Sequence, residues 1–367
     1  MRLGRLLHGG VKRITNYFKP GVKSNILREA SYIFNSDICW GPVKVLEIET
    51  TSYCPAGCIM CPKKYNFKRQ PGHMPIGLFK KIIKQLEPED QIDNHGGRPI
   101  IRLVHYGEPC LYPNFYDSIK ICKDQGLYTM VSSTASLFTR DRMREAIGSG
   151  LDQVWMMVDG MDEDTSTRIR GPAAPFNKSV ENIHAFIDMK RALGVSHPII
   201  NVIMIRQPAN AHQWKEFTNY WSTVKGVGPQ LAYFSNFGGD VPEINNILRE
   251  LQATDGQPQE DKRVSACNRY RCFYPWHSVS ILNDGRVVPC CRDLNGSYIL
   301  GDLNEKSLKQ IWNDEPIRKL RNEFINRGTA NLLCRTCNEA NNEIGLPWQI
   351  YPGVMSIGKI FPHRYRR

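Results

Sequence analysis

The sequence predicts an α/β fold, a partial (β/α)6 barrel followed by a small cysteine-bearing domain. Six near-continuous apolar runs alternate with amphipathic runs between residues 43 and 237, which is typical of buried parallel strands connected by helices. Six further cysteines then lie between residues 267 and 337. An open doubly wound sheet is the alternative, but a phosphate-binding G-x-G-x-x-G pattern is absent after the first apolar run.

Each expected strand but the last is followed by an expected helix. Because parallel barrels carry their chemistry at the carboxyl ends of the strands, polar or glycine-rich segments should follow each strand. The strands are expected at residues 43–51, 99–106, 127–133, 151–159, 197–206 and 229–237. The helices are expected around residues 77–87, 113–125, 140–149, 178–193 and 210–224.

The composition is that of a soluble globular protein. The chain has 367 residues, of which 41% are hydrophobic and 23% charged. It has no run of 18 apolar residues, so no transmembrane segment is expected, and its first residues lack the apolar region of a secretory signal. Twelve cysteines in such a chain are expected to bind metal, because cytosolic thiols are kept reduced. We therefore expect a cytoplasmic protein.

Positive charge is concentrated at the two ends of the chain. The net charge is +12, and residues 1–28 carry seven Lys or Arg and no acid. The ends either attract phosphate, nucleotide or an anionic surface, or form a solvated basic surface; we favour the second, and nucleic acid is not an expected partner. The expected division is a basic arm (1–40), the barrel (41–240), a linker (241–262), a second domain (263–345) and a basic tail (346–367).

Three cysteines follow the first expected strand at C-x₃-C-x₂-C spacing: Cys54, Cys58 and Cys61. Three soft thiolates suit an iron–sulfur cluster, and since a four-iron cube usually takes four cysteines, one iron would be left open for a small molecule. A zinc loop or inert thiols are the alternative. Three close cysteines without a nearby fourth ligand fit zinc poorly.

This spacing resembles the signature of the radical S-adenosylmethionine superfamily, although Met60 stands where an aromatic residue usually precedes the last cysteine. The resemblance implies a TIM-like partial barrel in which a [4Fe–4S] cluster binds S-adenosyl-L-methionine and passes it one electron from a reducing donor such as flavodoxin or ferredoxin. It also implies homolysis to a 5′-deoxyadenosyl radical that abstracts a substrate hydrogen.

The strand ends extend this resemblance. Residues 106–109 are similar to the family's GGEP segment, with Tyr106 in place of the first glycine, and the family's segment contacts the methionine amino group. The hydroxyls after the third strand and the arginine after the fifth would bind the methionine carboxylate or the ribose. The cofactor contacts implied are Tyr106, Gly107, Glu108, Pro109, Ser132, Ser133, Asp159 and Arg206.

The later cysteines resemble the auxiliary-cluster extension called SPASM, or twitch in its shortened form. The turn at 283–285 predicts a hairpin, and a helix over 307–324 would bring Cys290 towards the final cysteine pair. Cys267 is a reserve ligand, and Cys291 is expected to point away from the cluster because adjacent strand residues face opposite sides. A four-cysteine zinc site is the alternative. The resemblance implies one auxiliary [4Fe–4S] cluster held by Cys272, Cys290, Cys334 and Cys337.

The fate of the substrate radical defines the reaction. An auxiliary cluster that accepts an electron, together with a base, gives net oxidation, and His105 is the candidate base. A thiol that returns hydrogen to the opposite face gives epimerisation, and Cys110 is the candidate donor. We expect oxidation of a small sugar-like or aminocyclitol substrate, phosphorylated or nucleotide-linked if the basic ends contribute. The alternatives are an epimerase, a peptide-modifying enzyme and a non-catalytic iron–sulfur electron carrier.

Overall fold

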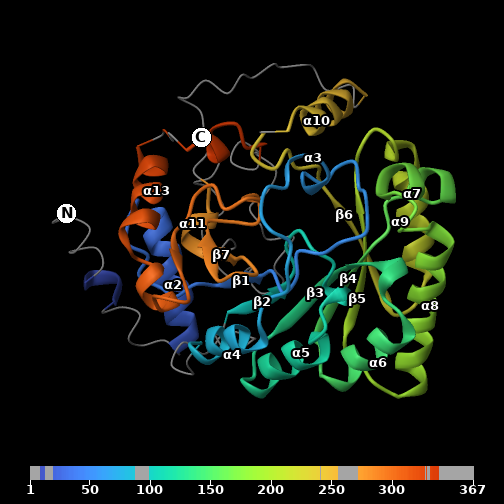
Figure 1. Cartoon of the computed structure of the whole chain (residues 1–367), viewed down its shortest axis with the longest axis horizontal. Helices are drawn as coiled ribbons and strands as arrows, with labels where there is room; N and C mark the ends of the chain where they lie inside the picture. The colour runs from blue at the N-terminus through green and yellow to red at the C-terminus, as the bar shows by residue number, and fades with distance from the viewer. Residues whose placement is uncertain are drawn as a thin grey trace.

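The computed structural model describes residues 9–12, 20–86, 99–239, 241–254, 272–326, 328 and 331–338. Cys267 and the expected basic tail lie outside the described residues. In the part of the chain that is described, helices surround a central sheet. The cysteine-rich C-terminal segment lies beside the first strand of the barrel (Figure 1).

Nine strands of the described chain form one sheet, in the order β6-β5-β4-β3-β2-β1-β7-β8-β9. The first six pair in parallel with their sequence neighbours, and β6 forms one edge of the sheet. The predicted α/β partial barrel is therefore confirmed. The strands are β1 (Val45–Ile48), β2 (Ile100–Leu103), β3 (Thr129–Thr134), β4 (Gln153–Met157), β5 (Ile199–Ile205), β6 (Val227–Ala232), β7 (Ser278–Ile281), β8 (Arg286–Val288) and β9 (Gly301–Asp302).

The expected helices form between these strands, and each turns its apolar side towards the sheet. Of the described helices between these strands, α3 and α7 were not predicted. The sequence of α7 is polar, but Asp162 caps it by accepting the Thr165 N–H at 2.7 Å. The helices are α2 (Pro20–Ile33), α3 (Lys63–Asn66), α4 (Ile76–Lys84), α5 (Phe115–Asp124), α6 (Arg140–Gly148), α7 (Glu163–Arg170), α8 (Phe176–Ala192), α9 (Trp214–Thr223), α10 (Pro242–Thr254), α11 (Tyr274–His277), α12 (Leu308–Ile311), α13 (Glu315–Ile325) and α14 (Leu332–Arg335).

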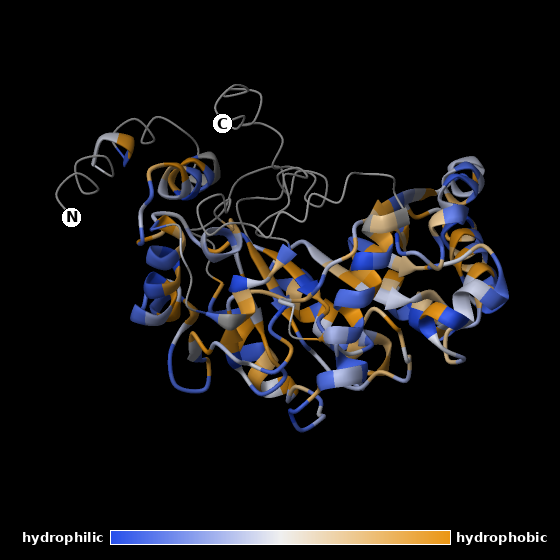
Figure 2. Cartoon of the chain, turned by 90° about the horizontal axis from the view of Figure 1, so that it is seen from above, coloured by the Kyte–Doolittle hydropathy of each residue, from blue (hydrophilic) through white to orange (hydrophobic). Residues whose placement is uncertain are grey.

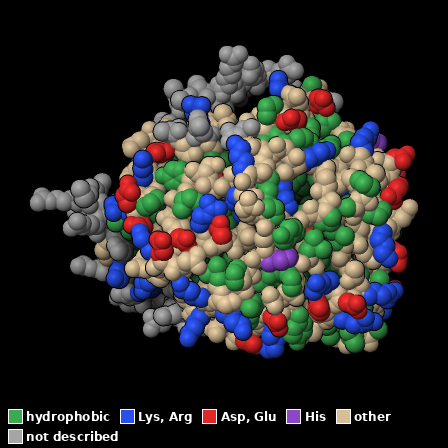
Figure 3. All heavy atoms as spheres, in the orientation of Figure 1, with side chains coloured by type: hydrophobic (Ala, Val, Ile, Leu, Met, Phe, Trp, Pro, Cys, Tyr) green, Lys and Arg blue, Asp and Glu red, His purple; other side chains and the backbone are tan. Residues whose placement is uncertain are grey.

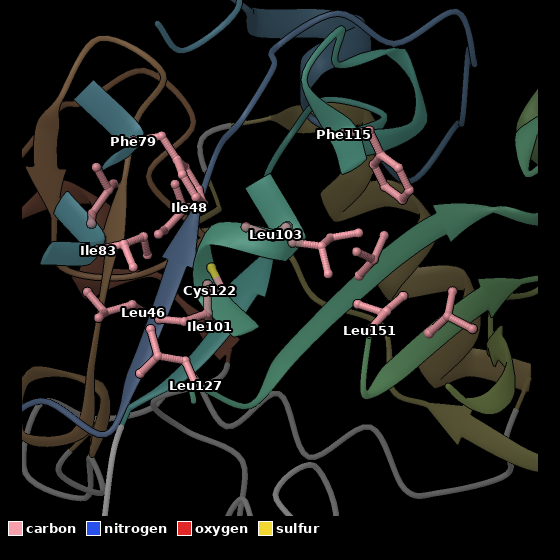
Figure 4. Close-up of a cluster of buried hydrophobic side chains, with 14 of the residues drawn as sticks. Leu46, Ile48, Phe79, Ile83, Ile101, Leu103, Phe115, Cys122, Leu127 and Leu151 are labelled. Atoms are coloured by element: carbon pink, nitrogen blue, oxygen red, sulfur yellow. The ribbon is translucent and has the colours of Figure 1, made fainter. Parts of the chain in front are cut away.

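Alternate residues of β1 face opposite sides of the sheet. Leu46 and Ile48 are fully buried in the main core between the sheet and the helices, near Phe79 of α4 (Figure 4). Hydrophobic residues accordingly follow the strands, whereas hydrophilic residues mark the outer helices (Figure 2). Glu47, which lies between them in β1, and Glu49, which directly follows the strand, lie on the other, inner face of the sheet.

The cysteine-rich segment begins with two strands that extend the barrel sheet. β7 and β8 pair antiparallel around a turn in which Gly285 has φ +98°, so the predicted hairpin is confirmed. β7 also pairs in parallel with β1, with Val45 opposite Ser278 and Ile48 opposite Ile281. The strand that leads to the second cysteine set therefore lies directly beside the strand that leads to the first.

The single helix expected over residues 307–324 is wrong, because the structure has two helices there, α12 and α13. Asp314 caps α13 by accepting the Glu315 N–H at 2.9 Å. Pro316 follows in the first turn, where its missing N–H costs nothing, whereas inside a longer helix the same residue would break a hydrogen bond.

Helices α2 and α13 pack near the same end of the sheet. Glu29 of α2 lies 2.7 Å from His277 Nε2 of α11. Arg321 of α13 is fully buried and donates to the carbonyls of Pro275 and Asp37 at 2.8 and 3.0 Å. None of the described helices is long and apolar enough to cross a membrane. Basic and acidic side chains are interspersed over the face seen in Figure 3.

Gly107 allows the end of β2 to approach the segment after β1, and this contact can be tested. A Cβ atom at this position would lie 1.8 Å from the Thr51 carbonyl oxygen. We therefore expect Gly107→Ala to lower the free energy of unfolding by about 1 to 3 kcal/mol or more, as measured by denaturant unfolding. Gly77→Ala on α4 is the matched control, since a Cβ there meets nothing within 4 Å and should stabilise the helix by up to about 1 kcal/mol. Equal midpoints for the two variants would contradict this.

Candidate active site

The first cysteine loop lies between β1 and α3 and docks on the end of α7. The Gly57 N–H donates to the Arg170 carbonyl at 3.1 Å, and the Ile59 N–H donates to the Ile169 carbonyl at 2.8 Å. Cys58 is buried, whereas Cys54 and Cys61 are half-buried as whole residues. Helix α7, which was not predicted from the sequence, therefore supports the first cysteine loop.

The three thiols of this loop lie close enough to affect one another. Burial raises the pKa of Cys54 to about 11, and the charge of Glu108 adds to the effect. Burial raises the pKa of Cys61 to about 12, and the charge of the neighbouring Cys58 adds to this effect. Three crowded thiolates need positive charge beside them, which the iron of a cluster provides. The donor set therefore fits the iron–sulfur cluster that its spacing implies.

Arg170 connects this loop to the end of β4. Its Nη1 lies 3.9 Å from Cys58 Sγ, and its Nη2 lies 2.6 Å from Asp159 Oδ2. The Ile205 N–H donates to the other Asp159 oxygen at 2.6 Å, and Asp159 is fully buried. Protein groups thus already bind both oxygens of Asp159, so its contact with S-adenosylmethionine stays a prediction that this geometry does not favour.

Glu108, after β2, is a buried carboxylate surrounded by neutral donors. The Ser133 hydroxyl donates to it at 2.7 Å, the Thr134 N–H at 2.8 Å and the Cys110 N–H at 3.2 Å. Burial raises its pKa, and among the described Lys, Arg and His side chains none forms an ion pair with it. A buried carboxylate with this environment lacks a cation, and an ammonium group from a ligand would provide one.

The other predicted cofactor contacts are spread around this position. Pro109 begins a short 3-10 helix, Pro109–Leu111, in which Pro109 and Cys110 are buried. Ser132 is half-buried and faces the opposite side of β3 from Ser133. Arg206 lies at the end of β5 with its guanidinium 5.0 Å from the ring centre of Trp214.

The Cys110 thiol faces the core and not the inner face of the barrel. It lies 3.2 Å from the Ser133 hydroxyl and belongs to the main hydrophobic core, which includes Phe115 and Ile119. Burial raises its pKa well above the usual value. This placement is that of a small buried core residue, so a role as hydrogen donor stays a prediction without geometric support.

The four predicted auxiliary ligands line a single pocket. Cys272, Cys290, Cys334 and Cys337 surround it together with aromatic and aliphatic side chains and Arg292. Within the part of the chain that is described, no group of three His, Cys, Asp or Glu side chains is arranged to hold a single metal ion. In a four-iron cube each thiolate binds a different iron, and four cysteines around one pocket are a donor set of this kind.

The inner face of the barrel carries paired charges. Glu47 forms an ion pair with Arg102 and accepts the Ser280 hydroxyl at 3.0 Å, and Glu49 lies 2.8 Å from Arg69. His105 Nδ1 lies 3.3 Å from the same Glu49 oxygen. Burial alone would raise the pKa of Glu49, but His105 and then Arg69 lower it to about 2. Glu49 is therefore ionised and accepts a hydrogen from Nδ1 of His105.

Three polar atoms on this inner face are buried and bind no group among the described residues. They are Nε2 of His105, the hydroxyl of Tyr106 and Nε1 of Trp155. The His105 and Tyr106 rings lie 4.6 Å apart, and the Arg102 guanidinium lies 5.1 Å from the Trp155 ring. Buried polar atoms usually have partners, so this surface fits a polar ligand.

Tyr106 lies between the two cysteine sets. Burial raises its pKa, and the groups whose charges act on its hydroxyl include Cys61 of the first set and Cys290 of the second. Its ring centre is 6.0 Å from that of Phe237, which follows β6. The ligand-binding surface of the barrel is thus bordered by both candidate cluster sites.

Sequence reasoning missed Cys291 as a residue of this inner face. Its side chain was expected to point away from the auxiliary site. In the structure its thiol lies beside Glu47, and Arg292 Nη1 donates to its sulfur at 3.0 Å. Burial, countered by Arg292, raises the pKa of the Cys291 thiol to about 12. The acids at alternate positions of an apolar strand, Glu47 and Glu49, were a visible signal of a polar interior.

Comparison with known proteins gives the same assignment. The model described as the radical SAM superfamily matches residues 48–207, and the SPASM model, described as an iron-sulfur cluster-binding domain, matches residues 272–338. Together the two matches span well over half of the chain.

Relatives and solved structures of three kinds are similar to this chain. A tungsten-containing aldehyde ferredoxin oxidoreductase cofactor-modifying protein of Pyrococcus furiosus is 26% identical, over 82% of this chain and 87% of that protein. The S-adenosyl-L-methionine-dependent 2-deoxy-scyllo-inosamine dehydrogenase of Niallia circulans is 23% identical, over 81% and 93%. Streptococcus suis SuiB bound to precursor peptide SuiA has a TM-score of 0.59 at 14% identity, covering 87% of this chain and 74% of SuiB.

Each of the two family models matches a segment that contains one of the two cysteine sets. They imply [4Fe–4S] clusters, one of them auxiliary, and S-adenosyl-L-methionine as the cofactors, which the clustered thiols and the buried Glu108 fit. The chain belongs to the radical S-adenosylmethionine superfamily and carries a C-terminal iron–sulfur cluster-binding domain of the SPASM type.

Proposed function

We propose that this chain is a radical S-adenosylmethionine oxidoreductase that dehydrogenates a small polar substrate, such as a sugar-like or aminocyclitol alcohol, inside the barrel. The position of Tyr106 between the two cysteine sets carries the proposal, since a substrate beside this side chain would border both clusters. When bound, the cofactors supply abstraction of a hydrogen atom and an acceptor for the remaining electron.

Glu108 would bind the amino group of S-adenosylmethionine. Its carboxylate is oriented by Ser133 and Thr134 and lies in a site from which water is excluded. An ammonium partner would compensate the buried charge. Ser132 and Arg206 are the proposed partners of the methionine carboxylate or the ribose, because both stand towards the carboxyl ends of parallel strands, β3 and β5, that lie on either side of β4.

His105 would take the proton that leaves the substrate. An ionised Glu49 accepts the Nδ1 hydrogen of His105, and in the neutral tautomer that carries this hydrogen the lone pair is on Nε2. That nitrogen is buried on the inner face of the barrel, without a partner among the described residues. Glu49 therefore fixes the tautomer and the ring orientation that a general base needs.

The inner face supports a small polar substrate. The hydroxyl of Tyr106, Nε1 of Trp155 and Nε2 of His105 would each be satisfied by hydroxyl or amino groups. The Glu47–Arg102 ion pair makes the surface near these three atoms polar and not apolar. A relative at 23% identity is named as a dehydrogenase of an aminocyclitol, which is a molecule of this kind.

Epimerisation is a second candidate, favoured by Cys291. The thiol of this residue lies on the inner face beside Glu47, and not in the core as Cys110 does. Its hydrogen atom would pass to the substrate carbon, and the resulting thiyl would need one electron and one proton from outside to be restored. Oxidation remains the first proposal, because the Glu49–His105 pair supplies a base that epimerisation does not require.

Isotope labelling distinguishes these functions. The reconstituted protein is incubated anaerobically with dithionite, S-adenosylmethionine and 2-deoxy-scyllo-inosamine deuterated at its ring carbons, and then with further aminocyclitols, sugars and peptides. We expect deuterium in 5′-deoxyadenosine and a product two hydrogens lighter. A product of unchanged oxidation state in which one ring deuterium has been replaced by solvent hydrogen would replace oxidation by epimerisation. Failure to form any 5′-deoxyadenosine would indicate an electron carrier.

Replacing Glu108 tests the proposed amino-group contact. Glu108→Gln should weaken S-adenosylmethionine binding about 10- to 100-fold, because a hydrogen bond to a charged group is lost, as measured by equilibrium dialysis of protein with its full iron content. Glu181→Gln, at an exposed position on α8, should bind as the wild type does. Unchanged binding by Glu108→Gln would remove this residue from the site.

Replacing His105 separates proton removal from hydrogen abstraction. His105→Asn should reduce the yield of oxidised product about 100-fold or more, while 5′-deoxyadenosine still forms, since only the base is lost. His184→Asn is the control, because His184 lies on α8, where its Nε2 is 3.0 Å from the Tyr220 hydroxyl. A variant whose turnover equals that of the wild type at every pH would exclude His105 as the base.

Iron content tests the two metal sites. The reconstituted protein should hold about eight irons and eight sulfides per chain, which corresponds to two four-iron cubes. Replacing both Cys334 and Cys337 by Ala should reduce each count to about four. Cys122→Ala removes a thiol that is buried in the main core and should leave both counts unchanged. About four irons in the wild type would mean that the second pocket holds something other than a cube.

A further inference from the structure

The auxiliary pocket has one formally charged side chain among its described lining residues. Besides the four cysteines, the pocket is lined by Tyr274, Phe324, Leu333 and Arg292. A guanidinium is charged at any pH that the protein meets. Arg292 is half-buried as a whole residue and its Nε atom is buried, so water screens this charge less than it screens a charge on the open surface.

Contacts on the barrel side hold Arg292 in this position. Its Nη1 donates to Cys291 Sγ at 3.0 Å, and its guanidinium carbon lies 5.3 Å from the ring centre of Phe237. Phe237 in turn lies 6.0 Å from Tyr106 on the inner face. The cation is therefore fixed between the auxiliary pocket and the surface on which the substrate is proposed to bind.

We propose that Arg292 raises the reduction potential of the auxiliary cluster and so makes it a better electron acceptor. A four-iron cube bound by four thiolates is anionic, and one added electron increases that negative charge. A fixed cation at the pocket wall stabilises the reduced form more than the oxidised form, because Coulomb energy is large where water is scarce. The direction of electron flow depends on the proposed dehydrogenation, whereas the potential itself does not.

Potentiometry of the full chain with both clusters tests this inference. The midpoint of the auxiliary cluster is followed by electron paramagnetic resonance, and its signal is recognised because added S-adenosylmethionine leaves it unchanged. Arg292→Gln should shift this midpoint to a more negative potential. Arg292→Lys keeps the charge and should stay closer to the wild type than the Gln variant does.

Arg286 provides the matched control within the same segment. Its Nη2 lies 2.7 Å from Asp284 Oδ2, both side chains are partly exposed to water, which screens their charges, and Arg286 is not among the described pocket residues. Arg286→Gln should leave the midpoint unchanged. If Arg292→Gln fails to retain iron, Arg292→Met, which suits the apolar lining, replaces it with the same expectation.

The midpoint also separates this inference from the proposed function. A negative shift in a neutral variant supports the role of Arg292 whether or not an aminocyclitol is oxidised. A neutral variant with full iron content and the wild-type midpoint would overturn it, even if dehydrogenation were established. A shift of equal size in Arg286→Gln would overturn it as well, because the effect would then not be specific to the pocket wall.

Discussion

The interior of this barrel depends on two buried carboxylates that the first strand presents to the inner face. Glu47 and Glu49 are nearly inaccessible to water, and ionised groups at such positions are costly unless they are paired. Arg102 compensates the first, and Arg69 with His105 compensates the second. Because these pairs fill the centre with polar groups, the inner face becomes a binding surface in place of the packed apolar layers of a closed barrel.

The two halves of the chain contribute opposite walls to this surface. The cysteine loop and Glu108 stand at the ends of the first two strands, whereas Cys291 and Arg292 come from the C-terminal hairpin. Tyr106 lies between these walls. Its bulky phenol narrows the interior, which supports a small substrate and places a hydroxyl between the two metal sites.

Local patterns predicted the barrel strands, their helices and the hairpin, because each depends on residues that are close in sequence. The helix break before Pro316 was also visible locally, since Asp314 is a favourable N-cap residue and a proline two residues after it favours a new helix start. Pairing of β7 with β1 leaves no local pattern, because the partners are separated by more than two hundred residues. The surroundings of Cys110 and Cys291 depend on that pairing and on the turn after β2, so sequence alone did not reveal that Cys110 lies in the main core and Cys291 lies beside Glu47.

The pairing of β7 with β1 also affects how the protein is made. The chain is synthesised from its N-terminus, so one edge of β1 lacks its neighbour until Ile281 has left the ribosome. During that time the first cysteine loop extends from an unfinished sheet whose exposed edge invites wrong pairing. The sheet beside the first cysteine loop is therefore completed only when the segment that leads to the second cysteine set has been made.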